Sequence, residues 1–210
     1  GFRVEFHALR LDRVQVLESA ARIEPLGVGI NVLPHAVREL TELGLVDQLE
    51  TIGVRTAELA YYDRHGSRIW AEPRGIEAGY HWPQYSVHRG HLQLLLLEAV
   101  RERLGVDAVT CGARVRSVRM DGDQATVQWG PRDDLRVTHA DVVVAADGIH
   151  STVRAERHPD EGAPIWNGSV LWRGTSHARP FLTGRSMIMA GHRDLKFVAY
   201  PIGPARDGVQ

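Results

Sequence analysis

The chain contains little cysteine and almost no lysine. Cys111 is the single cysteine among 210 residues, so no disulfide can form within the chain, and the reducing cytoplasm is the expected location. Of the 25 basic residues only Lys196 is a lysine, and the arginines are scattered along the chain. With 26 acidic residues the formal net charge is -1, which gives no electrostatic case for binding nucleic acid or an anionic membrane.

Long hydrophobic runs and several common catalytic motifs are also missing. No apolar stretch approaches the roughly 18 residues of a membrane-spanning helix, and no signal peptide opens the chain. The sequence has no GxSxG, GxxxxGK[ST], HExxH or paired CxxC motif. His88 and His91 are three residues apart, but no carboxylate or thiol stands at ligand spacing, so we expect no metal site.

The segment ADVVVAADGIHSTVR, residues 140–154, is the most informative part of the chain. Its run of valine and alanine does not alternate with polar residues, which predicts a strand over 141–146 that is buried on both faces of a parallel sheet. Ligands of such sheets bind beyond the carboxyl ends of the strands. Asp147 and Gly148 stand at that end, where glycine permits a tight turn, and Arg154 follows to hold an anion or tie down the loop.

A strand is also predicted at residues 13–17, directly before Glu18. This pattern is typical of the second strand of a dinucleotide-binding βαβ unit, whose terminal acidic residue accepts hydrogen bonds from the adenosine ribose. A solvated surface role for Glu18 is the alternative. The first strand and the GxGxxG motif of such a unit are absent before it, so we expect the chain to be truncated or altered at its N-terminus.

Two glycines in the segment PLGVGIN, residues 25–31, indicate that the backbone there comes close to another group. The alternative is a tight turn before a helix. Pro34 suits the first turn of that helix, an apolar stripe follows at helical spacing, and Gly44 is expected to end it in a left-handed conformation.

A hairpin and a second helix are predicted in the middle of the chain. Alternation in AELAYYD and RIWAE, separated by a turn containing Gly66, predicts a hairpin over residues 57–72. A helix is expected from Arg89 to Gly105, with enough leucines to predict that it is deeply packed. An arginine at a buried helix start requires an anion or hydrogen-bond acceptors in front of it.

The second half of the chain predicts two further groups of strands. Residues 113–138 contain three short strands separated by turn residues, which predicts a β-meander. Later, SVLWRGTS, SMIMAGH and LKFVAYPIG are expected to be strands of an antiparallel sheet. Trp172, Arg173 and Tyr200 are suited to lining a pocket for an aromatic acid, because arginine pairs with a carboxylate through two hydrogen bonds. An exposed arginine on the sheet is the alternative.

Four of these segments resemble, in the correct order, motifs of the FAD-dependent aromatic hydroxylases, the para-hydroxybenzoate hydroxylase class of flavoprotein monooxygenases. They are Glu18, PLGVGIN, the HRGHLQ string at 88–93 and the Asp-Gly string at 140–154. The likeness is densest to the subset acting on phenazine carboxylates and hydroxybenzoates. It implies an α/β fold, in which a glutathione-reductase-type, Rossmann-like FAD-binding domain with a β-meander is interleaved with an antiparallel β-sheet substrate domain. The expected FAD-binding domain is 1–52 and 86–160, and the substrate domain is 53–85 and 161–210.

The resemblance also implies which residues contact the cofactor. The adenosine ribose and adenine would meet Glu18 and the backbone of Val115. Gly29, Ile30 and Asn31 would contact the isoalloxazine ring, and Arg89 and Gln93 would reach the ribityl-pyrophosphate region. The loop of Asp147 and Gly148 would lie beside the FAD pyrophosphate, and in the family this loop is implicated in the use of NAD(P)H.

The activity implied by the resemblance is hydroxylation of a small aromatic acid of phenazine or hydroxybenzoate type. NADH or NADPH would reduce FAD, and a flavin peroxide formed with O₂ would deliver one oxygen atom to the ring. No acid–base pair stands out, as expected when the cofactor carries the chemistry. The enzyme is expected to be a monomer or homodimer.

Two alternatives remain open. A non-catalytic remnant or interaction module on the same fold would explain the missing GxGxxG and the missing later Gly-Asp motif. A flavin-dependent reductase or dehydrogenase would oxidise NAD(P)H without inserting oxygen.

Overall fold

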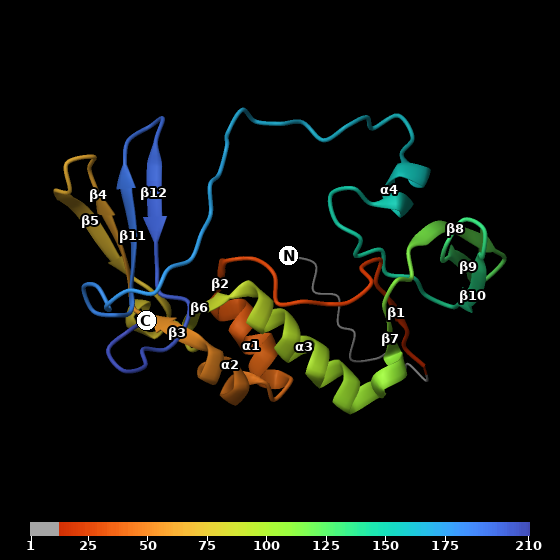
Figure 1. Cartoon of the computed structure of the whole chain (residues 1–210), viewed down its shortest axis with the longest axis horizontal. Helices are drawn as coiled ribbons and strands as arrows, with labels where there is room; N and C mark the ends of the chain where they lie inside the picture. The colour runs from red at the N-terminus through yellow and green to blue at the C-terminus, as the bar shows by residue number, and fades with distance from the viewer. Residues whose placement is uncertain (1–12) are drawn as a thin grey trace. The chain divides into compact units, whose positions relative to one another are not determined.

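The computed structural model describes residues 13–210, which form two compact units (Figure 1). Unit 1 contains the described residues up to Ile23 together with Val100–Leu171, and unit 2 contains Glu24–Ala99 and Trp172–Gln210. Residues 24–52, expected in the FAD-binding domain, therefore cluster with the hairpin at 57–72. Residues 1–12 of the expected FAD-binding domain lie outside the described part.

The β-meander of unit 1 is confirmed. Its antiparallel strands are β8 (Val115–Asp121), β9 (Gln124–Trp129) and β10 (Arg136–Ala140), in the order β10-β9-β8. Gly122, with φ +63°, makes the tight turn between the first two strands. A hydrophobic core is formed on this sheet by Ala113, Val118, Ala125, Val127 and Trp129.

The strand predicted before Glu18 is present but short. Strand β1 (Val16–Leu17) pairs in parallel with β7 (Val109–Thr110), which follows the 3₁₀ helix η3 (Val106–Ala108). Leu17 packs against the core of the meander, so β1 belongs to unit 1.

The prediction of a buried strand at 141–146 is wrong. Residues 142–147 adopt no regular secondary structure, and Val142 and Val144 are 56% and 72% exposed. A strand inside a parallel sheet needs hydrogen-bonded neighbours, and among the described residues β1 pairs only with β7. The tight turn is confirmed, since Gly148 has φ +77° and α4 (Thr152–Arg157) begins shortly after it.

In unit 2, three helices accompany a three-stranded sheet. The helices are α1 (Pro34–Glu42), α2 (Val46–Ile52) and α3 (Arg89–Leu104), of which α3 belongs to unit 2 as far as Ala99. The antiparallel sheet has the order β2-β6-β3, formed by β2 (Gly29–Val32), β6 (Gln84–His88) and β3 (Gly53–Thr56). Side chains from both layers make one core: Val32, Val37, Leu40, Leu45, Leu49, Tyr85, Val87, Leu95 and Ala99.

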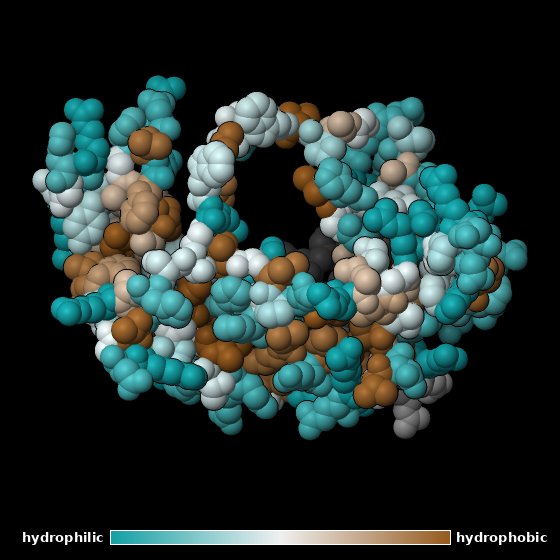
Figure 2. Space-filling view, in the orientation of Figure 1, coloured by the Kyte–Doolittle hydropathy of each residue, from teal (hydrophilic) through white to brown (hydrophobic). Residues whose placement is uncertain are grey.

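The boundaries predicted for α1 and α3 are confirmed, but deep packing of α3 is wrong. Gly44 has φ +68° after α1, and Gly105 has φ +92° after α3. Leu96 and Leu104 are 38% and 53% exposed, because leucines surround α3 and only one stripe of them meets the core. Figure 2 shows hydrophobic residues at the surface over the region of α1 and α3. Arg89 is likewise exposed, not buried.

A four-stranded sheet completes unit 2. Strands β4 (Glu58–Tyr62) and β5 (Arg68–Pro73) form the predicted hairpin, and the 3₁₀ helix η2 (Gly75–Ala78) follows. The order is β12-β11-β4-β5, with β11 (Ser186–Gly191) antiparallel to β12 (Lys196–Ala199). Strand β11 pairs in parallel with β4, although they are far apart in sequence (Figure 1). The hairpin β4–β5 and the later pair β11–β12 are antiparallel as predicted, and the two pairs join through a parallel contact.

The first strand predicted for this sheet is also wrong. The segment SVLWRGTS, residues 169–176, has no regular secondary structure and is exposed. None of the described strands pairs with it, so its backbone lacks the hydrogen-bonded neighbour that a strand needs.

Across residues 13–210, none of the helices has the length and apolar character needed to cross a membrane.

Candidate functional site

The residues of PLGVGIN do not form a loop throughout, because Gly29, Ile30 and Asn31 belong to strand β2. Gly29 is paired with His88 of β6, and Asn31 is paired with Ser86. Since side chains alternate along a strand, these four residues share one face of the sheet. Ile30 lies on the opposite face, which carries the core residues of unit 2. The strand thus separates a polar face from the hydrophobic core.

The close approach predicted for the glycines is made by the same chain. A Cβ atom at Gly29 would lie 2.5 Å from Tyr200 Cε2 and 2.7 Å from Ile202 Cγ2. The amide of His88 donates a 3.1 Å hydrogen bond to the carbonyl of Ile202, which holds this segment along the polar face. Tyr200, predicted from the sequence as a substrate contact, is thereby brought beside Gly29.

Asn31 is the end of a row of hydrogen-bonded side chains on this face. Its Oδ1 accepts a 2.6 Å hydrogen bond from Ser86 Oγ, which lies 2.7 Å from Thr56 Oγ1. Its Nδ2 donates to Met187 Sδ at 3.7 Å. Ser86 is completely buried and Asn31 is half-buried, so the row leads from the interior to a half-buried residue.

Arg89 begins α3 and lies against the glycine-containing segment. Its amide donates a 2.8 Å hydrogen bond to the carbonyl of Val28. A Cβ atom at Gly27, where φ is +113°, would lie 2.6 Å from Arg89 Nε. A Cβ atom at Gly90 would overlap the backbone of Pro25, so the Arg-Gly pair and the segment depend on each other. Gln93, one turn further along α3, is exposed.

The Asp147–Gly148 loop of unit 1 holds the start of helix α4. Asp147 Oδ2 accepts hydrogen bonds from the amides of Thr152 at 2.7 Å and Val153 at 3.5 Å. Burial raises the pKa of Asp147, but hydrogen bonds from Ser151 and from backbone amides outweigh this and lower the pKa below its usual value. Arg154 bonds to the carbonyl of Ile149 and to Glu161, so it ties down the loop.

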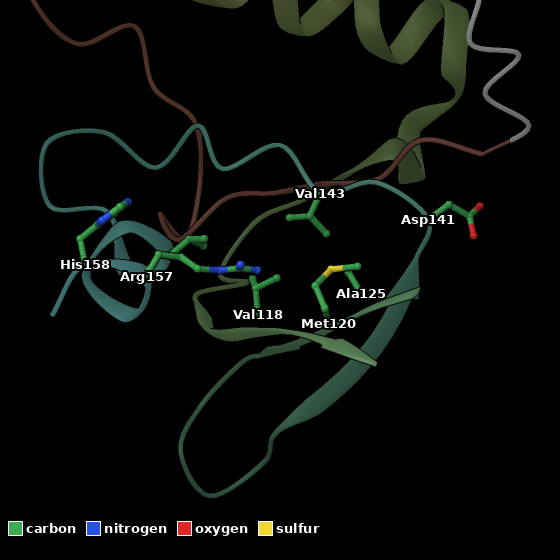
Figure 3. A pocket seen from close by; sticks show the side chains of 8 residues that line it. Val118, Met120, Ala125, Asp141, Val143, Arg157 and His158 are labelled. Carbon is green, nitrogen blue, oxygen red and sulfur yellow. The ribbon is translucent and has the colours of Figure 1, made fainter. Parts of the chain in front are cut away.

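Two cavities lie within unit 1. The larger, of about 490 Å³, has an apolar floor from the meander and a rim that includes Asp141 and Val143 of the coil and Arg157 and His158 of the α4 region (Figure 3). The smaller, of about 290 Å³, includes Asp147 and Gly148 in its lining.

The other predicted site residues of unit 1, Glu18 and Val115, make contacts within that unit, whereas Trp172 and Arg173 of unit 2 are exposed. Glu18 Oε1 accepts hydrogen bonds from the amide of Ala20 at 2.6 Å and from Ser19 Oγ at 3.2 Å. Val115 begins β8 and packs on the core of the meander. Trp172 is 91% exposed, and Arg173 is also exposed, so the structure does not bring either of them to Tyr200.

Ser86 and Thr56 were missed by the sequence reasoning. The signal was available for Ser86, because in QYSVH the residues Gln84, Ser86 and His88 alternate with Tyr85 and Val87. For Thr56 there was no such signal, since its contact with Ser86 joins two strands that are far apart in sequence.

The donor set in unit 2 fits a large ligand with an anionic part. Arg89 supplies an exposed cation, Asn31 an amide, and Gly27 and Gly29 two positions at which the backbone carries no side chain. Such groups suit a phosphate-bearing dinucleotide with a polar ring edge, as FAD has. Among the described residues there is no cluster of three or more histidine, cysteine or acidic side chains suited to a metal ion.

Comparison with known proteins identifies a family and several relatives of this chain. Residues 13–164 match the model of the FAD binding domain family. The chain is 46% identical over 199 residues to phenazine 1,6-dicarboxylic acid hydroxylase PhzS of Lysobacter antibioticus, covering 93% of this chain and 49% of the relative. It is 30% identical over 201 residues to 3-amino-4-hydroxybenzoate 2-monooxygenase of Streptomyces cremeus, covering 91% and 45%. The chain thus spans about half the length of these curated relatives.

Solved structures agree on the fold. Klebsiella pneumoniae HpxO complexed with FAD and uric acid matches with a TM-score of 0.67 at 22% identity, covering 93% of this chain and 48% of that one. The 2,6-dihydroxypyridine-3-hydroxylase from Arthrobacter nicotinovorans matches with a TM-score of 0.65 at 24% identity, covering 93% and 47%. The predicted α/β fold of the FAD-dependent hydroxylases is confirmed, and the chain belongs to the FAD binding domain family.

Proposed function

We propose that this chain is part of an FAD-dependent, NAD(P)H-using monooxygenase that hydroxylates a small aromatic acid of phenazine or hydroxybenzoate type. The 46% identity to a phenazine 1,6-dicarboxylic acid hydroxylase over 93% of the chain carries the proposal. The single cysteine supports a cytoplasmic enzyme. The overall reaction consumes one O₂, one NAD(P)H and one proton, and yields a hydroxylated ring, NAD(P)⁺ and water.

The residues of unit 2 have distinct roles in this proposal. Arg89 provides positive charge for the ribityl-pyrophosphate region, with Gln93 on the same helix. Gly29 and Asn31, which share one face of β2, contact the flavin ring, and Asn31 offers its amide as a hydrogen-bond donor. Ile30 contacts the ring through its backbone, because its side chain lies on the opposite face. Tyr200, which touches Gly29, is the substrate contact that the geometry favours.

The residues of unit 1 serve the other parts of the cofactor. Glu18 and Val115 contact the adenosine. Asp147 and Gly148 approach the pyrophosphate, and the hydrogen bonds that Asp147 accepts from α4 give this loop a defined shape. When bound, FAD supplies the redox chemistry and O₂ activation, and the chain's own groups bind and orient it and exclude water.

Trp172 and Arg173 remain weaker candidates for substrate binding. Both are exposed, so a role in binding requires the segment around them to move against a bound aromatic acid. Arg173 would then pair with the carboxylate.

Labelled oxygen tests the proposed reaction. The purified protein is incubated with FAD, with NADH or NADPH, and with phenazine carboxylates or hydroxybenzoates under ¹⁸O₂, and the products are weighed by mass spectrometry. One labelled oxygen atom in an aromatic product is expected. NAD(P)H oxidation without any labelled product would instead indicate a reductase or dehydrogenase. A protein with no flavin absorption bands, even after FAD is added, would be a non-catalytic remnant or interaction module.

A further inference from the structure

The row of hydroxyl groups behind Asn31 crosses all three strands of the sheet β2-β6-β3. Ser86 stands on the central strand directly opposite Asn31, and Thr56 stands on β3 beyond it. The two oxygen–oxygen distances along the row are 2.6 Å and 2.7 Å. Ser86 is 0% exposed and Thr56 is 3% exposed, so water does not compete for these hydrogen bonds.

The hydrogen bonds in this row have one consistent direction. Ser86 has a single hydroxyl hydrogen, which it donates to Asn31 Oδ1. Thr56 must therefore donate to Ser86 Oγ, because that oxygen has no second hydrogen to give. The carbonyl side of the Asn31 amide is thus held towards the interior. Its Nδ2 donates one of its two hydrogens to Met187 Sδ.

We propose that Ser86 and Thr56 are positioning residues that orient the Asn31 amide towards the bound cofactor. This inference rests on the proposed function, in which Asn31 contacts FAD. An amide rotates readily about its side-chain torsions, and holding it in one orientation avoids the entropy cost of ordering it on binding. The row makes Asn31 a pre-oriented donor.

Packing alone does not require this arrangement. At positions 86 and 56 of two strands, valine would satisfy the β-sheet preference without burying a hydroxyl. Two buried hydroxyls cost desolvation energy, which is offset here because each is hydrogen-bonded. The row ends at Asn31, the one member that is half-buried and not fully buried.

The test compares variants that remove one hydroxyl at a time. Flavin is removed from each protein, FAD is titrated back by fluorescence, and the visible spectrum of bound flavin is recorded. Ser86→Ala is expected to weaken FAD binding about 3- to 10-fold, as loss of one hydrogen bond does. Its flavin bands should shift in the same direction as those of Asn31→Ala. Thr56→Val should show a smaller effect of the same sign, and Thr56→Ser, which keeps the hydroxyl, should resemble the wild type.

A matched control and a double variant separate positioning from general damage. Ser117→Ala removes another buried serine hydroxyl, bonded to Gln128 Oε1 on the meander, and should leave FAD affinity and spectrum unchanged. The double variant Asn31→Ala/Ser86→Ala should bind FAD no more weakly than Asn31→Ala alone, because Ser86 acts through Asn31.

Three results would overturn the inference. Ser86→Ala or Thr56→Val with wild-type affinity and spectrum would remove the positioning role while leaving the proposed function intact. Additive losses in the double variant would do the same. A wild-type protein that binds no FAD would overturn both the inference and the proposed function. If Ser86→Ala does not fold, the pair Thr56→Val and Thr56→Ser decides the question.

Discussion

The ring of Tyr200 lies against the backbone of Gly29, so closely that a Cβ atom at position 29 would be 2.5 Å from Tyr200 Cε2. These residues are separated by most of the chain, yet both were candidates from the sequence. Because of this contact, position 29 of β2 has room only for glycine, since any larger side chain would overlap Tyr200. The same contact also places the substrate candidate Tyr200 beside a candidate flavin contact.

Replacing Gly29 by alanine should destabilise the protein. The added methyl group would overlap Tyr200 and Ile202, and overpacking of this kind costs about 1–3 kcal/mol. Urea unfolding followed by circular dichroism measures the change in the free energy of unfolding. Gly203→Ala is the matched control, because a Cβ atom there meets nothing within 4 Å. Equal stability of Gly29→Ala and the wild type would show that the contact with Tyr200 is not tight.

Replacing Arg89 by alanine should weaken FAD binding about 10- to 100-fold. The reason is the loss of a charge-assisted hydrogen bond to the phosphates, which contributes about 1.5–3 kcal/mol. Equilibrium titration of the apoprotein with FAD measures the dissociation constant. In the control Arg193→Ala, the side chain removed is 95% exposed, and affinity should not change. An unchanged dissociation constant for Arg89→Ala would remove this residue from the site.

Asp147 should contribute to stability in a pH-dependent way. Its pKa in the folded protein is lowered, so its contribution is present above the ordinary pKa of 3.8 and is lost as pH falls through the folded pKa. At pH 7, Asp147→Ala should lower the free energy of unfolding by about 0.5–1 kcal/mol, because amides of α4 lose an acceptor that is largely solvent-exposed.

Unfolding curves at several pH values provide the measurement for Asp147. The difference between the wild type and Asp147→Ala should shrink as pH falls below 3.8. Asp133→Ala, which removes an exposed carboxylate from the turn between β9 and β10, should give no comparable pH-dependent difference. A constant difference across this range would mean that the carboxylate charge is not what holds the loop.

Local pattern predicted those elements whose contacts are close in sequence. The hairpin β4–β5 and the meander β8–β10 follow from period-two alternation and turn residues, and α1 follows from Pro34, its apolar stripe and Gly44. The prediction of a strand at 141–146 was wrong because a buried strand needs hydrogen-bonded neighbouring strands, and the composition of a segment does not show whether such neighbours exist. The strand predicted at 169–176 was wrong for the same reason.

The candidate site could be predicted only in part. Arg89, Gly29, Asn31 and Tyr200 were identified from residue type and from resemblance to a family, and the structure brings them together in unit 2. Ser86 and Thr56 were not identified: the alternation in QYSVH marks the face on which Ser86 lies, but neither residue's local sequence shows which side chain it meets across the sheet. Their role depends on which strands become neighbours.

The sequence by itself determined the family, the periodic elements and the glycine-containing segment that must lie close to another part of the chain. Tertiary structure alone decided what that part is: Tyr200 against Gly29, and Ser86 and Thr56 behind Asn31. It also decided the parallel pairing of β11 with β4. The physical reason is that local propensity acts over a few residues, whereas strand neighbours and buried hydrogen bonds are selected by the packing of the whole chain.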